Sequence, residues 1–368
     1  MISKNVKIFT FISLLFIILL VLGGVSAQST DETQEDINAD TTISTDSNII
    51  EQDNEMNVQK QVNNKNTKEA TTVSTYDELK NKINGATDEW TEIELENKTY
   101  TINEPITWGT RSDGQSRTFV IRGNGAIIDG SNTYQFITVN ENYRLDLLNL
   151  TIQHTKADKG AAVINYGELN AHNVTFLENT AAYDGGAIYS TGRVIVSGNT
   201  VFYKNMITNG VNGNGGAAIF TTGELAIADS VFSRNNATYT AEASASNGAN
   251  GGAIFVSNSI SDLIIQNTSF WYNDGRHGGA ILIDDNLGRN EGIKRITGCE
   301  FVFNSALYGG AIEVYNDLLI EDSYFSDNEV WGYGSSNINP KGGAICVNDL
   351  VSSGTPGKLT VRNTTFEE

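Results

Sequence analysis

The stretch FWYNDGRHGGAI at residues 270–281 is repeated at residues 301–312 as FVFNSALYGGAI. Each copy begins with a Phe-x-x-Asn motif and ends with a Gly-Gly-Ala-Ile motif, and the two motifs alternate along the chain. Because an internal repeat outweighs length as an indicator of architecture, the 368 residues predict one repeat array and not two or three separate domains. Phe-x-x-Asn occurs at Phe176–Asn179, Phe202–Asn205, Phe232–Asn235, Phe270–Asn273, Phe301–Asn304 and Phe325–Asn328.

The Gly-Gly-Ala-Ile motif marks a second fixed point of each repeat. Its full form occurs at residues 185–188, 251–254, 278–281, 309–312 and 342–345, a form with one extra alanine at Gly215–Ile219, and a degenerate form at Gly160–Ile164. The 36 glycines follow no three-residue period, which excludes collagen and favours many bends.

Apolar and polar residues alternate just before the repeat phenylalanines. Leu263 and Ile265 precede Phe270 by seven and five residues, and the same relation holds before Phe232 and Phe325. A period of two predicts short strands with one inward face, whereas the i, i+3, i+4 pattern of a helical repeat is absent. Three residues before each phenylalanine stands Asn or Asp, with Gly298 as the exception, and such residues suit turns with left-handed backbone. These residues are Asn173, Asn199, Asp229, Asn267, Asp322 and Asn363.

One strand and turn unit of this kind cannot bury its apolar face alone, but stacked units can. The sequence therefore predicts an all-β fold, a right-handed parallel β-helix of the pectate-lyase-like (pectin lyase fold) solenoid type. Ladders of Phe, Ile and Leu should lie inside it, and ladders of Asn at its corners. We assign the repeats to residues 119–368. We expect the array to be cut short at its C-terminus, since Glu368 comes before the next expected corner Asn.

The N-terminal part of the chain divides into three further segments. Residues 1–27 are predicted to be a signal peptide, because Lys4 and Lys7 precede an apolar run of about 15 residues, shorter than the roughly 20 that span a bilayer. A membrane anchor is the alternative. Residues 28–74 hold ten acidic residues against three lysines, which predicts a disordered acidic linker. Residues 75–118 should form a cap and entry strands, with a short helix at 75–85 that Thr75 and Glu78 begin as a capping box.

The alternating GGAI and FxxN motifs behind a signal peptide resemble the chlamydial polymorphic membrane protein (polymorphic outer membrane protein) repeat. The chain is also similar to adhesin-like surface proteins of gut methanogenic archaea, which place an entry such as Tyr76–Asn84 before a coil such as Gly123–Gly130. The resemblance covers roughly residues 75–368. It implies an archaeal, secreted, cell-surface protein with a role in attachment, held to the cell envelope through a region outside this chain. The shared motifs are scaffold residues, and they specify no ligand.

Polysaccharide lyases and hydrolases share the β-helix, so a carbohydrate-active enzyme is the alternative function, and a purely structural envelope stalk is a third. His277, Asp284 and Asp285 supply acid and base groups, but their order differs from that of pectin hydrolases. We therefore expect no catalytic residue. Cys299 and Cys346 lie at different positions of the repeat and are expected to be separate buried thiols. The three histidines share no metal-ligand spacing, so no metal or other cofactor is expected.

Binding residues are expected where aromatic side chains follow the repeat Phe or occur in loops of variable length. Their rings can stack on sugars or enter a partner surface, and packing between coils is the alternative. This candidate ligand surface comprises Tyr203, Trp271, Tyr272, Trp331 and Tyr333. Candidate glycosylation sites are Asn97, Asn149 and Asn236. The net charge of −20 argues against nucleic acid, so the expected partners are glycans or proteins of a host or neighbouring cell.

Overall fold

The computed structural model describes residues 71–111, 113–209, 213–237, 250–257, 262–284, 292–315, 317–331, 341–348 and 358–368. The chain divides into two units, Met1–Asn66 and Thr67–Glu368, and all of the described residues belong to the second. The predicted signal peptide and nearly all of the predicted linker lie outside the described residues. Among the residues that are described, no helix is long and apolar enough to cross a membrane.

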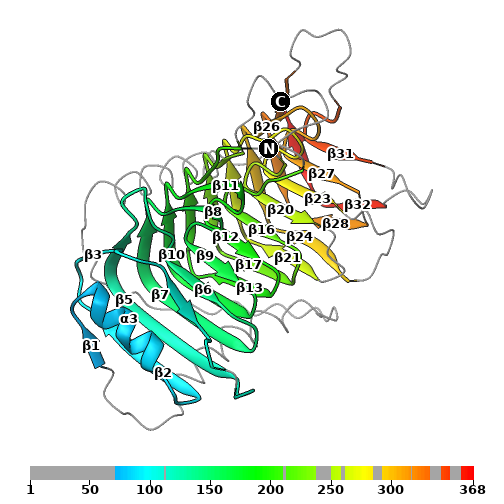
Figure 1. The fold of residues 1–368 in the computed structure, drawn as a ribbon. Helices are drawn as coiled ribbons and strands as arrows, with labels where there is room; N and C mark the ends of the chain where they lie inside the picture. Colours follow the sequence, from blue (N-terminus) through cyan, green and yellow to red (C-terminus); the bar gives the residue numbers. More distant parts are fainter. Residues whose placement is uncertain are drawn as a thin grey trace, which may run out of the picture. The chain divides into compact units, whose positions relative to one another are not determined.

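The second unit is a parallel β-helix, as predicted, in which successive coils stack their strands side by side (Figure 1). In the later coils the largest sheet takes two strands from each coil, one before and one after the predicted Asn turn, whereas in earlier coils one longer strand runs through this position. In the described residues it contains β1 (Thr71–Val73), β2 (Trp90–Leu95), β3 (Thr99–Thr101), β5 (Arg117–Asp129), β7 (Tyr143–Gln153), β10 (Glu168–Leu177), β13 (Arg193–Ser197), β14 (Val201–Tyr203), β17 (Leu225–Ala228), β18 (Val231–Ser233), β21 (Leu263–Gln266), β22 (Ser269–Trp271), β24 (Lys294–Thr297), β25 (Glu300–Val302), β28 (Leu318–Glu321), β29 (Tyr324–Ser326), β32 (Leu359–Arg362) and β33 (Thr365–Glu367).

Two further faces complete each coil. The strands that begin at the Ile of Gly-Gly-Ala-Ile and its counterparts form a second sheet, which in the described residues contains β4 (Ile106–Trp108), β6 (Ile137–Val139), β9 (Val163–Asn165), β12 (Ile188–Ser190), β16 (Ile219–Thr221), β20 (Ile254–Ser257), β23 (Ile281–Asp284), β27 (Ile312–Val314) and β31 (Ile345–Val347). Short strands follow the corner Asn: β8 (Lys156–Lys159), β11 (Thr180–Asp184), β15 (Met206–Ile207), β19 (Asn236–Ala237), β26 (Ser305–Ala306) and β30 (Glu329–Val330).

The repeat phenylalanines form the predicted ladder inside the coils. Phe202 pairs in register with Phe176 on one side and Phe232 on the other, and the pairing continues to Phe366. Their rings stack with centroids 4.5–5.0 Å apart, which matches the spacing of neighbouring strands. Burying each such side chain contributes about 1.5–3 kcal/mol, so the ladder is a main source of stability.

The predicted turn before each phenylalanine has the expected left-handed backbone. Asn173 and Asn199 have φ of +52° and +63°, and Gly298, the exception in the sequence pattern, has φ of +64°. A residue without a Cβ adopts this conformation at no steric cost, and Asn and Asp tolerate it. The same physical requirement therefore explains both the pattern and its exception.

The two glycines of Gly-Gly-Ala-Ile serve different purposes. Gly278 has φ of +63°, whereas a Cβ on Gly279 would lie 2.0 Å from the carbonyl oxygen of Gly310 in the next coil. The first glycine therefore allows the bend, and the second allows the close approach of two coils.

The variant motif at Gly215–Ile219 aligns with the full motif of the preceding coil. Ile188 pairs with Ile219, so Ala217 stands opposite Gly186. The expectation of an extra alanine there was wrong: Ala217 replaces the second glycine of the motif.

The predicted cap helix is α3 (Tyr76–Gly85). The Thr75 side chain accepts a hydrogen bond from the Glu78 backbone N–H at 3.2 Å, and Leu79 and Ile83 are buried against the first coil. The linker was predicted to extend to residue 74, but residues Thr71–Val73 already form strand β1. Its Thr-Thr-Val sequence pairs parallel with β2 and buries Val73, because β-branched residues suit a pleated, half-buried surface.

Candidate functional site

A ladder of buried asparagines runs along one corner of the coils, as the Phe-x-x-Asn motif predicts. The amide Nδ2 of Asn205 donates to Oδ1 of Asn235 at 3.0 Å and to the carbonyl oxygen of Phe176 at 3.0 Å. The backbone N–H of Asn205 donates to the same Oδ1 at 3.1 Å. Thr155 takes the place of Asn in the coil before Asn179, and its backbone N–H and hydroxyl both donate to the Asn179 Oδ1. The ladder thus satisfies a row of buried polar groups and holds each corner rigidly.

The residue immediately before each ladder position also has left-handed backbone, and we call these residues the corner row. They share φ values between +50° and +56° and follow the ring ladder by two residues. The corner row comprises His154, Glu178, Lys204, Arg234, Tyr272, Phe303 and Asp327. Because each of these residues adjoins a buried, hydrogen-bonded partner, its backbone is held in place while its side chain is displayed.

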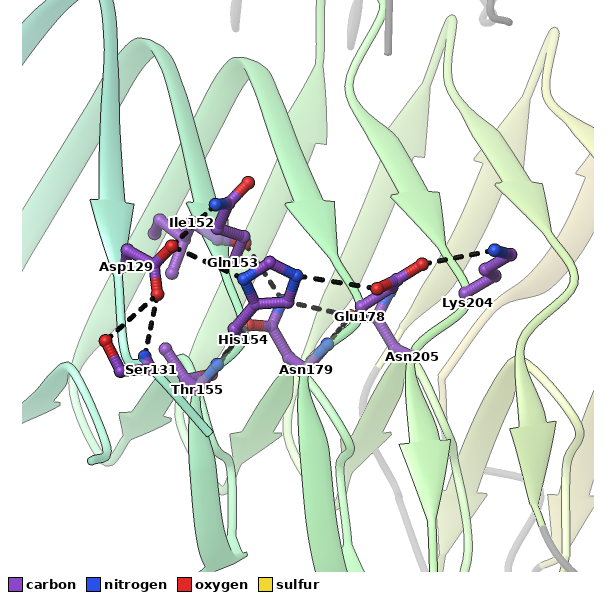
Figure 2. Close-up of polar contacts among 10 residues, drawn as sticks. All are labelled: Asp129, Ser131, Ile152, Gln153, His154, Thr155, Glu178, Asn179, Lys204 and Asn205. Atoms are coloured by element: carbon purple, nitrogen blue, oxygen red, sulfur yellow. Dashed lines mark hydrogen bonds and ion pairs between the residues drawn. The ribbon is translucent and has the colours of Figure 1, made fainter. Parts of the chain in front are cut away.

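The first part of the corner row is a chain of ionisable side chains that contact one another (Figure 2). His154 lies between two carboxylates, with Nδ1 3.3 Å from Asp129 and Nε2 3.4 Å from Glu178. Lys204 pairs with Glu178 at 3.1 Å. Burial of the Asp129 carboxyl acts to raise its pKa, but hydrogen bonds, chiefly from Gln153, outweigh that effect and hold the pKa below its ordinary value. Lys204 therefore compensates the charge of Glu178.

The second part of the corner row combines a cation with two aromatic rings. The Arg234 guanidinium lies over the Tyr272 ring, 4.9 Å from its centroid. The Tyr272 ring stacks on Phe303 with centroids 4.9 Å apart and an interplanar angle of 14°. Arg234 is exposed, and Tyr272 and Phe303 remain 39% and 44% exposed. An exposed strip of guanidinium and aromatic carbon is a plausible contact surface, since such side chains are enriched at binding sites.

The predicted aromatic ligand residues divide into different environments. Tyr272 lies in the exposed strip, and Tyr203 is half-buried with Lys204 over its ring at 5.3 Å. Trp271 is only 5% exposed, and its Nε1 lies 3.3 Å from the Glu300 carboxylate. Its inclusion in an exposed patch is therefore corrected, because its indole packs between coils. Trp331 is half-buried, and Tyr333 lies outside the described residues.

Of the acid and base residues noted in the sequence, His277 and Asp284 lie within the described residues. His277 Nδ1 lies 2.8 Å from the buried Glu313, whose other oxygen accepts the Tyr315 hydroxyl at 3.0 Å. Asp284 ends β23, and Asp285 lies outside the described residues. No group of three or more His, Cys, Asp or Glu side chains within the described ranges could hold a metal ion.

The two cysteines are separate buried thiols, as predicted. Burial raises the pKa of Cys299 to about 12 and also raises that of Cys346. Both are therefore neutral and unreactive in the folded protein at ordinary pH.

The glycosylation candidates differ in access. Asn97 and Asn149 are exposed, the latter in a left-handed turn with φ of +53°. Asn236 lies in β19 and is half-buried. Among the described residues its Oδ1 is buried without a hydrogen-bond partner. Glycosylation stays a prediction, with Asn97 and Asn149 better placed to receive a glycan than Asn236.

Comparison with known proteins agrees with the repeat. Residues 173–191 match the family model described as the Chlamydia polymorphic membrane protein repeat. A stretch of 139 residues is 34% identical to the metabotropic glutamate receptor-like protein R of Dictyostelium discoideum. That stretch spans 37% of this chain and 7% of the relative, so it covers a small part of that protein. No solved structure matches the chain significantly.

The sequence reasoning missed Arg234 and the contact of His277 with Glu313. Arg234 holds the same place after Phe232 as Tyr272 holds after Phe270, so the offset within the motif could have revealed it. The motif carries no such signal for His277 and Glu313, because they belong to different segments of neighbouring coils.

Proposed function

We propose that the chain is an exported, non-catalytic cell-surface protein that attaches to glycans or proteins of a host or neighbouring cell. The observation that carries the proposal is the exposed strip of Arg234, Tyr272 and Phe303 on a scaffold whose other repeat residues are structural. The match to a repeat of polymorphic membrane proteins supports a surface location. Anchoring through a region outside this chain, and an archaeal source, belong to the same proposal.

The architecture suits attachment because it pre-organises a long surface. Each corner-row residue adjoins a ladder Asn, or Thr155 in the case of His154, whose side chain is hydrogen-bonded to a neighbouring coil. A partner that binds there meets backbone that is already ordered, so less conformational entropy is lost on binding. Side chains on successive coils are displayed at about the 4.8 Å strand spacing, which suits an extended ligand.

Binding of the purified, fluorescently labelled protein to intact cells tests the proposal. Flow cytometry should show saturable binding that unlabelled protein competes away, and heat-unfolded protein serves as the control. Glycosidase or protease treatment of the cells then separates glycan from protein receptors. Binding that never saturates, or that unfolded protein reproduces, would exclude specific attachment.

A carbohydrate-active enzyme is the second candidate, and one observation favours it. Glu313 contacts His277 at 2.8 Å, and a carboxylate that orients an imidazole is a feature of general-base sites. We expect no release of unsaturated or reducing sugar from pectin or similar glycans by the purified protein. Sugar release that His277→Gln abolishes while cell binding persists would establish the enzyme instead.

A further inference from the structure

We propose that Arg234, Tyr272 and Phe303 bind an acidic sugar, one whose single carboxylate or sulfate lies beside an apolar ring face. This inference rests on the proposed attachment function and names its ligand class. It follows from three observations. Arg234 has no ion pair with a described residue, the rings of Tyr272 and Phe303 stack, and the whole protein carries a net negative charge.

Arg234 differs from most arginines of this chain. Six others among the described residues form ion pairs with carboxylates, including Arg122 with Glu92 and Arg193 with Glu224. Arg234 is exposed and makes no ion pair with a described residue. Its guanidinium instead lies over the Tyr272 ring, and none of its N–H groups pairs with a carboxylate of the described residues. A guanidinium held in this way can bind a carboxylate or sulfate with two parallel hydrogen bonds.

The two rings determine what accompanies the anion. Tyr272 and Phe303 stack face to face, so one face of each is taken by the other ring, and Arg234 takes the second face of Tyr272. The ring edges remain exposed as a narrow apolar strip next to the guanidinium. A sugar presents apolar C–H groups beside its polar substituents, so its ring can lie along this strip while its acidic group meets Arg234.

The net charge limits the density of anionic groups in the ligand. A protein of net charge −20 repels a polyanion, and nucleic acid carries one charge per about 1.7 Å of duplex. Lys204, in the preceding coil, is already paired with Glu178 at 3.1 Å. Arg234 is thus the one cation of the corner row that is free of a described carboxylate, and it can neutralise one charge. An isolated carboxylate or sulfate on a sugar meets this condition.

Calorimetry with three matched probes tests the inference: methyl galacturonoside, its neutral methyl ester, and methyl galactoside 6-sulfate, each of which carries at most one anionic group. We expect the protein to bind an acidic probe at least about tenfold more tightly than the methyl ester. The carboxylate and sulfate probes then decide which anion is preferred. Arg234→Gln should remove the preference for an acidic probe over the methyl ester, and Arg234→Lys should retain part of it. Tyr272→Asn should weaken binding of every probe.

Arg111→Gln is the matched control, because Arg111 is also an exposed arginine that lacks an ion pair within the described residues. It should bind as the wild type does. Equal affinity for the acid and its methyl ester, no binding of any probe, or an effect of Arg111→Gln equal to that of Arg234→Gln would overturn the inference. If cell binding persists in any of these cases, the attachment function stands and only the ligand class is wrong.

Discussion

Asn205 and Asn235 lie in neighbouring coils, and both the side-chain amide and the backbone N–H of Asn205 donate to the single Oδ1 of Asn235, at 3.0 and 3.1 Å. The same pair of bonds recurs from coil to coil, so the loss of one Asn affects two coils. These side chains are fully buried, and water cannot replace the lost bonds without entering the core.

Asn273→Ala should therefore destabilise the protein by on the order of 3 kcal/mol. It removes the acceptor for one side-chain N–H and for the backbone N–H of Asn235, and it removes a donor to the carbonyl of Phe232. Urea unfolding followed by circular dichroism measures the change. The exposed Asn97→Ala is the control and should shift the free energy of unfolding by less than about 0.5 kcal/mol. Equal effects of the two variants would mean that the ladder contributes nothing beyond an ordinary surface amide.

Gly279→Ala should cost several kcal/mol, about 3 or more, because the added Cβ would lie 2.0 Å from the Gly310 carbonyl oxygen and 2.7 Å from Ser305 backbone atoms. Gly85→Ala is a suitable control, because a Cβ on Gly85 meets nothing within 4 Å. Thermal unfolding should show a clear drop in Tm for the first variant and almost none for the second. Unchanged Tm for Gly279→Ala would show that the coils can separate without cost.

Gly298→Asn should be nearly neutral, within about 1 kcal/mol, because Asn occupies this position in other coils with the same left-handed backbone. A Cβ at this position would lie 2.7 Å from Oδ1 of Asn267, the end of a side chain, and no other atom is within 3 Å of it. Gly298→Val should destabilise by more than Gly298→Asn, since a β-branched residue is strained at φ of +64°. The difference between the two free energies of unfolding isolates the backbone requirement, and similar values would refute it.

Cys299 should resist iodoacetamide at pH 8.5 until the protein is unfolded, because its folded pKa of about 12 keeps it a neutral thiol. The pKa of the Cys299 thiol in the unfolded protein is the ordinary 9.0, so the unfolded state loses this proton first as the pH rises. Stability from this group is complete below about pH 9 and falls between pH 9 and 12. Cys299→Ala should show a shallower loss of stability over that range. Rapid alkylation of the native protein would contradict the burial of this thiol.

Much of the scaffold could be predicted because the repeat imposes its requirements at fixed offsets. The period of two before Phe270 identified the strands, and the Asn or Asp three residues before each Phe identified the left-handed turn that Gly298 also adopts. Strand β1 was missed because its Thr-Thr-Val sequence is too short to stand out at the end of an acidic segment.

The candidate site was harder to predict because it depends on neighbours in other coils. Whether an aromatic residue after the Phe is exposed depends on which side of the corner it lies. Trp271, one residue after Phe270, is buried, and Tyr272, two residues after it, is exposed. Coil lengths also vary, so residues such as His277 and Glu313 meet across coils without any fixed spacing between them.

Attachment of protein-coated beads to intact cells, compared between the wild type and the Arg234→Gln, Tyr272→Asn, Phe303→Asn triple variant, tests the central claim most directly. Asn is chosen for the two rings because it tolerates the left-handed backbone at these positions. If Arg234, Tyr272 and Phe303 form the binding surface, wild-type beads attach well above albumin-coated beads and the triple variant falls to the albumin level. Arg111→Gln attaches as the wild type does. Equal attachment of a correctly folded triple variant and the wild type would contradict the account.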